Sequence, residues 1–157
     1  MRRSRLDRID KKILNSLQSK GRITNVELAR SVGISAPPCL RRVRALEEAG
    51  FIKGYHAKVD RGALGYGVTV FASVKLVSQA EDDLVAFEKY IAALPMVREC
   101  HMLAGDVDFI LKIVSKDWDS YQSFLSKYLT MAPNVTSVKS SLSIRAAQDL
   151  PGVPIEA

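Results

Sequence analysis

Cysteine and histidine are scarce in this chain of 157 residues. Cys39 and Cys100 are the only cysteines and form no Cys-x-x-Cys pair, which excludes a disulfide framework and is typical of a reducing compartment. His56 and His101 are the only histidines. Because structural zinc sites group Cys and His at short spacings, these four residues predict no metal site.

Long hydrophobic runs are also absent. No stretch approaches the roughly 18 apolar residues of a membrane-spanning helix, and no apolar segment of a signal peptide follows the basic N-terminus. We therefore expect a cytoplasmic protein without a membrane partner. A hydrophobic content of 47% suffices for one core or two small ones and excludes a disordered tail.

Acidic residues are few in the first third of the chain, and basic residues are few in the rest. Residues 1–61 contain 15 Lys and Arg against 6 Asp and Glu, a net charge of +9. Residues 62–157 contain 8 against 11, a net charge of −3. This partition, hidden in the whole-chain charge of +6, indicates two modules with different partners.

Three short helices are predicted in the basic module. Thr24 and Glu27 form a capping box at the start of the second helix, and Gly33 ends it. Ser35 is expected to cap the third helix, which ends at Gly50. The first helix has an apolar stripe at spacings of three and four, namely Leu6, Ile9, Ile13 and Leu17.

The third helix carries arginines opposite its apolar side. On a helical wheel Arg41 lies opposite the core side, flanked by Arg42 and Arg44. Arginine suits bidentate contact with guanine edges and phosphates, so we expect this helix in the major groove of DNA. A solvated surface balanced by neighbouring glutamates is the simpler alternative, but the charge of the module favours DNA. The predicted DNA-binding residues are Ser35, Pro37, Pro38, Arg41, Arg42, Arg44 and Lys53.

Two β-prone runs on either side of Gly54 predict a hairpin over residues 51–59. This hairpin, which carries Lys53 and Lys58, would serve as a wing on the flanking DNA backbone. It completes a winged helix-turn-helix domain over residues 1–60, and three glycines predict a linker over residues 61–67.

From residue 68 onwards the hydrophobic pattern alternates. Two helices are predicted in this second module, the first capped by Ser78 with Glu81 and the second capped by Asp117. The order βαββαβ predicts an α+β, ferredoxin-like sandwich over residues 68–148, followed by a loosely packed tail over residues 149–157. The predicted strands cover residues 68–76, 97–103, 107–114 and 135–144.

Several stretches resemble the Lrp/AsnC (feast/famine) family of transcription regulators. The resemblance runs over about residues 5–148 without a gap and is closest to the leucine-responsive branch of the family. In the second module it rests on Gly105-Asp106-Val107-Asp108 and its neighbours, residues 99–112. In the first module it rests on residues 6–14, 21–29, 32–35, 39–47 and 50–55.

The resemblance implies a winged helix-turn-helix joined to a ferredoxin-like domain that binds an effector. It implies homodimers that assemble into tetramers or octamers and wrap double-stranded DNA. A small-molecule amino acid such as leucine would bind near the contact between dimers, and no other cofactor is implied. Carried over to this sequence, the effector-binding residues are Met102, Leu103, Gly105, Asp106, Asp108, Trp118 and Ser141.

The chemistry of these residues suits an amino acid, although it does not demand one. Loop N–H groups can hold an α-carboxylate, and Asp106 or Asp108 can hold an α-ammonium. Without the resemblance, Gly105-Asp106 is typical of an ordinary tight turn. Val107 stands where the family commonly has an aromatic residue, so the identity of the effector is not carried over.

We expect a sequence-specific transcription regulator of amino-acid metabolism genes that acts at the bacterial nucleoid. Its effector would shift an equilibrium between assemblies. The alternative is an architectural, nucleoid-type DNA-binding protein that responds to no effector. An enzyme on the sandwich is a third hypothesis, but no nucleophile–base pair or phosphate loop accompanies Asp106 and Asp108, so no catalytic residues are predicted.

Overall fold

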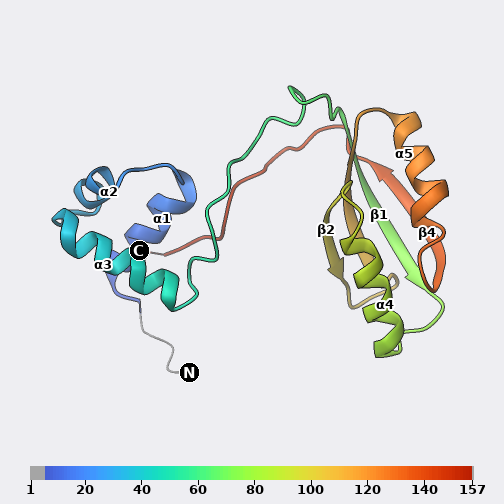
Figure 1. Cartoon of the computed structure of the whole chain (residues 1–157), viewed down its shortest axis with the longest axis horizontal. Coiled ribbons are helices and arrows are strands. Elements are labelled where there is room, and N and C mark those ends of the chain that lie inside the picture. The colour runs from blue at the N-terminus through green and yellow to red at the C-terminus, as the bar shows by residue number, and fades with distance from the viewer. Residues whose placement is uncertain (1–5, 157) are drawn as a thin grey trace. The chain divides into compact units, whose positions relative to one another are not determined.

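The computed structural model describes residues 6–156, which form two compact units (Figure 1). Unit 1 comprises Met1–Val59 and Gln148–Ala157, and unit 2 comprises Asp60–Ala147. The C-terminal tail thus belongs to the same unit as the N-terminal helices. Within the described part of the chain, no helix is long and apolar enough to cross a membrane.

Unit 1 contains three helices, α1 (Arg8–Ser19), α2 (Asn25–Val32) and α3 (Ala36–Glu48). The capping box of Thr24 and Glu27 at the start of α2 is confirmed. Gly33 ends α2 at φ +79°, a left-handed conformation that glycine adopts without steric cost. Ser35 occupies the N-cap position of α3, but its side chain makes no capping hydrogen bond.

The core of unit 1 is small and apolar. Cys39 is fully buried in it and therefore packs as a small hydrophobic residue. Six side chains are buried in this core, namely Ile13, Leu28, Ala29, Val32, Cys39 and Leu46.

The hairpin predicted over residues 51–59 is wrong, because this segment contains no strand. Its first residues instead close α3: the N–H groups of Phe51 and Ile52 donate to the carbonyl of Leu46 at 2.9 and 3.4 Å. Gly50 makes this possible at φ +76°. An isolated pair of short strands is marginal in water, and of the β-prone residues here only Ile52 packs against the core of unit 1.

Unit 2 has the predicted order βαββαβ. Its four strands form one antiparallel sheet in the order β2-β3-β1-β4. A π-helical turn, η1 (Leu125–Leu129), extends α5 and was not predicted. The elements are β1 (Val68–Leu76), α4 (Glu81–Ala92), β2 (Val97–Met102), β3 (Phe109–Ser115), α5 (Trp118–Phe124) and β4 (Val135–Leu142).

Both helices of unit 2 pack on the same face of the sheet (Figure 1). Phe87 and Ile91 of α4 share one core with Tyr121 and Phe124 of α5 and with the inward side chains of β1 and β3. The opposite face of the sheet, called the open face below, carries Phe71 at 38% exposure. An apolar ring at this exposure on an uncovered sheet marks a surface suited to a partner.

The helix caps of unit 2 were predicted only in part. Asp117 caps α5 as expected, since its side chain accepts from the N–H of Ser120 at 2.7 Å. The Ser78 cap is wrong: Ala80 occupies the N-cap of α4, and the Ser78 hydroxyl accepts from the Ala80 N–H instead.

Candidate DNA-binding surface and effector site

The turn between α2 and α3 fixes the start of the predicted recognition helix. Asn25, at the start of α2, donates from its side-chain amide to the carbonyl of Ala36 at 2.9 Å. Sequence reasoning did not identify this residue, because nothing in the pattern links position 25 to position 36. Ser35 and Pro37 beside this contact are exposed, and Pro38 is half-buried.

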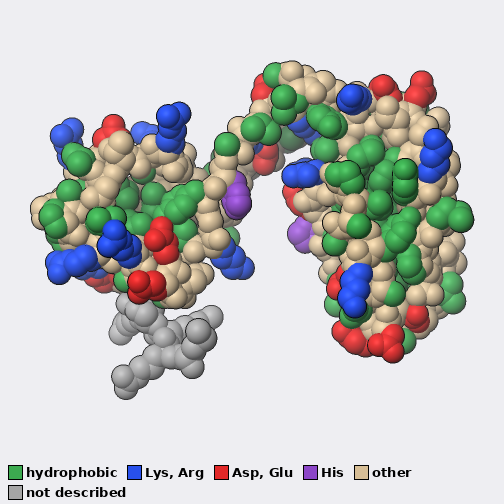
Figure 2. All heavy atoms as spheres, in the orientation of Figure 1, with side chains coloured by type: hydrophobic (Ala, Val, Ile, Leu, Met, Phe, Trp, Pro, Cys, Tyr) green, Lys and Arg blue, Asp and Glu red, His purple; other side chains and the backbone are tan. Residues whose placement is uncertain are grey.

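Arg41 and Arg44 project from α3 into solvent. Within residues 6–156 neither side chain has an ion pair or a hydrogen bond, so both guanidinium groups keep all their donors for a ligand. Lys53 is exposed in the segment after α3. All three cations are exposed on unit 1, and Figure 2 shows several Lys and Arg side chains on the surface of this unit.

Arg42 is engaged inside unit 1. Its Nη1 donates to Asp7 at 2.6 Å and to Asp10 at 2.7 Å. The same two carboxylates form the capping box of α1, so Arg42 joins the start of α1 to the middle of α3. The backbone N–H of Asp10 and then the Arg42 guanidinium hold the pKa of Asp7 below its ordinary value. The contacts of Arg42 are therefore those of a positioning residue, whereas Arg41 and Arg44 remain available.

The loop between β2 and β3, which is predicted to bind the effector, contains one buried carboxylate. Asp108 is only 5% exposed, and both of its oxygens accept hydrogen bonds at 2.7 Å, from the backbone N–H of Leu76 and from the side-chain amide of Gln79. These bonds hold the end of β1 against the start of β3. Gln79 was not identified in the sequence, since it lies 29 residues before its partner.

The rest of the loop is open to solvent. Met102 is 60% exposed and Leu103 is 41% exposed, although the Leu103 N–H donates to the carbonyl of Asp108 at 2.8 Å. Gly105 and Asp106 are exposed at the tip, and a Cβ at Gly105 would meet no atom within 4 Å. The tip therefore has room for a ligand beside its backbone N–H groups.

Trp118 and Ser141 lie away from this loop. Trp118 stands at the start of α5, where its ring lies 5.3 Å from that of Tyr121, and it is 41% exposed. Ser140 is bonded to Tyr121 on the helix side of β4, so the next residue, Ser141, faces the open side.

A single chain does not bring the predicted effector residues into one cavity. Asp108 precedes β3 and Trp118 follows it, and seven residues of strand span roughly 20 Å. Ser141 pairs in register with Phe71 of β1 and points to the other face of the sheet from Trp118. Any site that uses all of them needs residues from more than one copy of the chain.

Two family models match the two units. One described as a winged helix-turn-helix DNA-binding domain matches residues 6–53. One described as the Lrp/AsnC ligand-binding domain matches residues 69–153, more than half of the chain. The chain belongs to the Lrp/AsnC family. It is a DNA-binding transcriptional regulator with an amino-acid-binding domain, and like its family it is not an enzyme.

Relatives of the family match over nearly the full length of the chain. A leucine-responsive regulatory protein of Rhizobium meliloti is 51% identical over 94% of both chains. The Bkd operon transcriptional regulator of Pseudomonas aeruginosa is 44% identical over 90% of this chain and 92% of its own. A transcriptional regulator of Neisseria meningitidis, solved as an L-Met complex, has a TM-score of 0.91 at 32% identity and covers 96% of this chain and 97% of its own. The expected fold class is thereby confirmed.

Proposed function

We propose that this Lrp/AsnC regulator reads specific DNA sites with the exposed side of α3 and controls genes of amino-acid metabolism. The observation that carries the proposal is that the arginines of α3 differ in their contacts. Two carboxylates at the start of α1 bind Arg42. Arg41 and Arg44 extend from the same helix, and within residues 6–156 their side chains have no ion pair or hydrogen bond. A positioned helix with free guanidinium groups suits base and phosphate contacts in a major groove. Ser35, Pro37, Pro38 and Lys53 would flank this contact.

The effector is an amino acid with an apolar side chain, such as leucine or methionine. Two observations support this class: the relative from Rhizobium meliloti carries the name leucine-responsive, and the Neisseria meningitidis structure holds L-Met. The exposed apolar side chains of Met102 and Leu103 would contact such a side chain. The N–H groups near Gly105 would hold the α-carboxylate, and Asp106 would hold the α-ammonium. Asp108 would shape the loop through its bonds to β1.

The site is completed by assembly. Because Trp118 and Ser141 lie far from the loop within one chain, a neighbouring copy would supply them at the oligomer interface. Homodimers would pair through the open face of the sheet and assemble into tetramers or octamers around double-stranded DNA. An effector that binds this interface would shift the balance between assemblies, which requires unequal affinity for them. The place of action is the nucleoid in the cytoplasm.

A gel-shift comparison tests the DNA proposal. Arg41→Ala should lose roughly 1–3 kcal/mol of affinity for the preferred site and relax the preference at one base pair. Lys53→Ala should lower the affinity for all DNA sequences about equally. Lys127→Ala, an exposed cation of unit 2, is the matched control and should bind like the parent. If Arg41→Ala and Lys53→Ala also bind like the parent, the assignment of α3 and its flank is wrong.

A thermal-shift screen of the amino acids, with and without DNA, tests the effector proposal. A ligand that binds only the folded chain raises its unfolding midpoint, and the stabilisation grows with the logarithm of its concentration relative to Kd. We expect an apolar amino acid to stabilise the chain and to change its affinity for DNA. A chain that binds DNA identically with every amino acid would be an architectural protein instead.

A further inference from the structure

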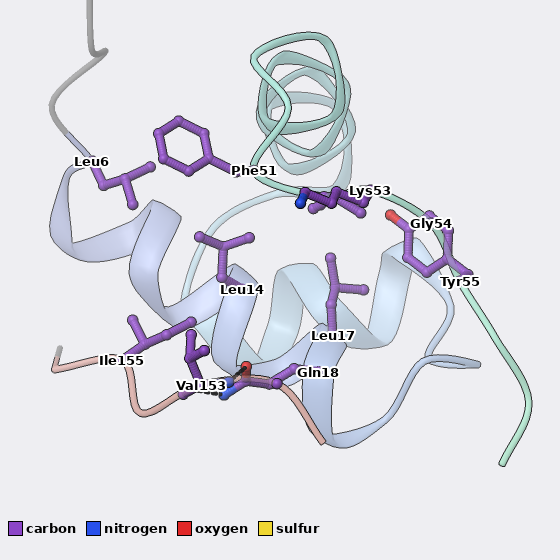
Figure 3. Close-up of a pocket in the computed structure, with 12 residues that line it drawn as sticks. Leu6, Leu14, Leu17, Gln18, Phe51, Lys53, Gly54, Tyr55, Val153 and Ile155 are labelled. Carbon is purple, nitrogen blue, oxygen red and sulfur yellow. Dashed lines mark hydrogen bonds between the residues drawn. The ribbon is translucent and has the colours of Figure 1, made fainter. Parts of the chain in front are cut away.

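The C-terminal tail is bound to α1 through its backbone (Figure 3). The side-chain amide of Gln18 donates to the carbonyl of Val153 at 2.8 Å and accepts from the N–H of Val153 at 3.2 Å. One turn earlier, Asn15 donates to the carbonyl of Ile155 at 3.0 Å. An amide that satisfies both the donor and the acceptor of one residue holds an extended peptide in a fixed register.

Gly152 is matched to this contact. It adopts φ +71°, and a Cβ built on it would lie 2.1 Å from the Oε1 of Gln18. Gln18 cannot swing away without breaking both of its bonds to Val153. Any other residue at position 152 therefore strains the backbone and collides with the group that binds the tail.

The tail also covers apolar surface on α1. A cavity of about 370 Å³ is lined by Leu14 and Leu17 of α1, by Val153 and Ile155 of the tail, and by residues 51–55 (Figure 3). Leu14 and Leu17 pack against the buried core of unit 1 but stay half-buried, so the tail lies over apolar surface that the three helices cover only in part. At the entry of the tail, Lys58 and Asp149 form an ion pair at 2.8 Å.

We propose that this groove on α1 is a sequence-selective binding site for the chain's own C-terminal peptide, so that residues 152–155 act as a releasable strap on the DNA-binding unit. The attachment consists of a few surface hydrogen bonds and modest apolar contacts, which permits exchange between bound and released states. The fixed register at Val153 and the requirement for glycine at position 152 give it selectivity.

The strap also bears on DNA binding, a consequence that rests on the proposed function. α1 is tied to α3 through Asp7, Asp10 and Arg42, and to the tail through Asn15 and Gln18. A released tail would remove the contacts of Asn15 and Gln18, and α1 would then be held by its packing in the core and by the ion pairs to Arg42 alone. The tail follows β4, the strand that carries Ser141, so the sensing unit has a covalent route to the strap. Release should therefore weaken DNA binding.

Peptide binding in trans tests the site itself. The chain is truncated after Pro151. A fluorescent peptide of residues 149–156 is titrated with this truncated chain, and binding is measured as a rise in the anisotropy of the peptide. We expect saturable binding and a rise in the unfolding midpoint of unit 1. The same peptide with Gly152→Val should bind at least about tenfold more weakly, the factor that corresponds to roughly 1.4 kcal/mol. A peptide with Glu156→Ala, an exposed position, should bind like the parent peptide. Equal affinity for all three peptides, or no binding, would overturn the proposal.

Full-length variants keep the test decisive if the shortened chain fails to fold. Gly152→Val and Gln18→Glu should each lower the unfolding midpoint of unit 1, by about 4–8 °C for each kcal/mol lost from a domain of this size. The controls are Gly21→Ala, whose Cβ would make only an ordinary 3.9 Å contact, and the exposed Gln122→Glu of unit 2. Midpoints equal to those of the controls contradict the strap.

DNA affinity, measured for the parent and for full-length Gly152→Val, separates this inference from the proposed function. If the parent binds DNA specifically and Gly152→Val binds it several-fold more weakly, both proposals stand. A parent chain without specific DNA binding contradicts the proposed function, whereas the peptide assay still decides on the groove. If the Gly152→Val peptide binds more weakly but the full-length Gly152→Val chain keeps the DNA affinity of the parent, the groove is supported and its coupling to DNA binding is overturned.

Discussion

Arg42 lies between two carboxylates of α1, 2.6 Å from Asp7 and 2.7 Å from Asp10. We predict that Arg42→Ala lowers the free energy of unfolding of unit 1 by about 0.5–1 kcal/mol, the range of well-formed solvent-accessible ion pairs. It should weaken binding to all DNA sequences to a similar extent, because it loosens the whole of α3. Urea titration and competition between base-substituted sites measure the two effects. Relaxed preference at a single base, with unchanged stability, would instead make Arg42 a base-contacting residue.

The same carboxylates predict how unit 1 responds to acid. The N–H of Asp10 and the Arg42 guanidinium lower the pKa of Asp7 in the folded state below its ordinary 3.8. Its contribution to stability is therefore complete above pH 3.8 and is lost as the pH falls through the lower, folded pKa. The pKa of Glu27 is lowered in the same way by Thr24, first through the backbone N–H. We expect a constant unfolding midpoint above about pH 5 and a fall below about pH 4. Asp7→Asn should show a smaller fall, and an equal fall would contradict this role for Asp7.

Asp108 and Asp106 differ in burial, and this separates their effects. Asp108→Ala would leave the buried N–H of Leu76 without its acceptor, which costs roughly 1–3 kcal/mol, whereas the amide of the exposed Gln79 can turn to water. We therefore predict a lower unfolding midpoint for unit 2, loss of the effector response and intact DNA binding by unit 1. Differential scanning calorimetry and gel shifts with effector measure these outcomes.

Asp106→Asn is the matched comparison at the exposed tip of the loop. Its stability should equal that of the parent, since surface substitutions away from special contacts change it by less than about 0.5 kcal/mol. Loss of the effector response in Asp106→Asn at full stability supports direct ligand contact. A normal response in both variants would contradict the assignment of the loop.

At the scale of elements, sequence patterns predicted those helix ends and strands that depend on interactions between neighbouring residues. The capping box of Thr24 and Glu27 and the left-handed Gly33 need only neighbouring residues, so the sequence located α2 closely. Alternation along residues 68–76 predicted β1 with its bounds, because one face of this strand is packed and the other is not. Asp117 was identified as a cap for the same local reason.

Elements that depend on distant partners were not predictable in this way. The segment 51–59 has the composition of a hairpin, yet its residues close α3 and line a cavity with the tail. The side-chain partners of the tail lie 135 or more residues away, so no local pattern predicts its hydrogen bonds. At the site, Asp108 was identified by resemblance, whereas its partner Gln79 has no local signal. The DNA-contact and effector residues stay predictions until the substitutions above are made.

At the scale of the whole molecule, the charge partition limits how the regulator contacts DNA. The first 61 residues carry a net charge of +9 and residues 62–157 carry −3, so the second part of the chain has no positive surplus with which to attract phosphates. Wrapping of DNA would require several basic units held around one assembly. In the proposed assembly, the contacts that join copies of unit 2 would therefore be as important for DNA binding as the arginines of α3.

Phe71 is the residue of the open face that best tests this assembly. It lies near the middle of β1, is 38% exposed, and pairs in register with Lys112 on one side and Ser141 on the other. We predict that Phe71→Arg converts the oligomer to monomers, because it replaces an apolar contact by a cation beside Lys112 and brings like charges together across a two-fold interface. Sedimentation equilibrium measures the mass directly.

Met131→Arg is the control for this change. Met131 is 72% exposed and follows η1, outside the sheet, so the same substitution there should leave the mass unchanged. A monomeric Phe71→Arg chain should keep a folded unit 1 but lose cooperative binding to tandem sites, since its basic units are no longer linked. It should also lose the effector response if a neighbouring copy completes the site. If Phe71→Arg keeps the mass of the parent, the open face is not the dimer interface, and the site would have to draw Trp118 and Ser141 from a different contact.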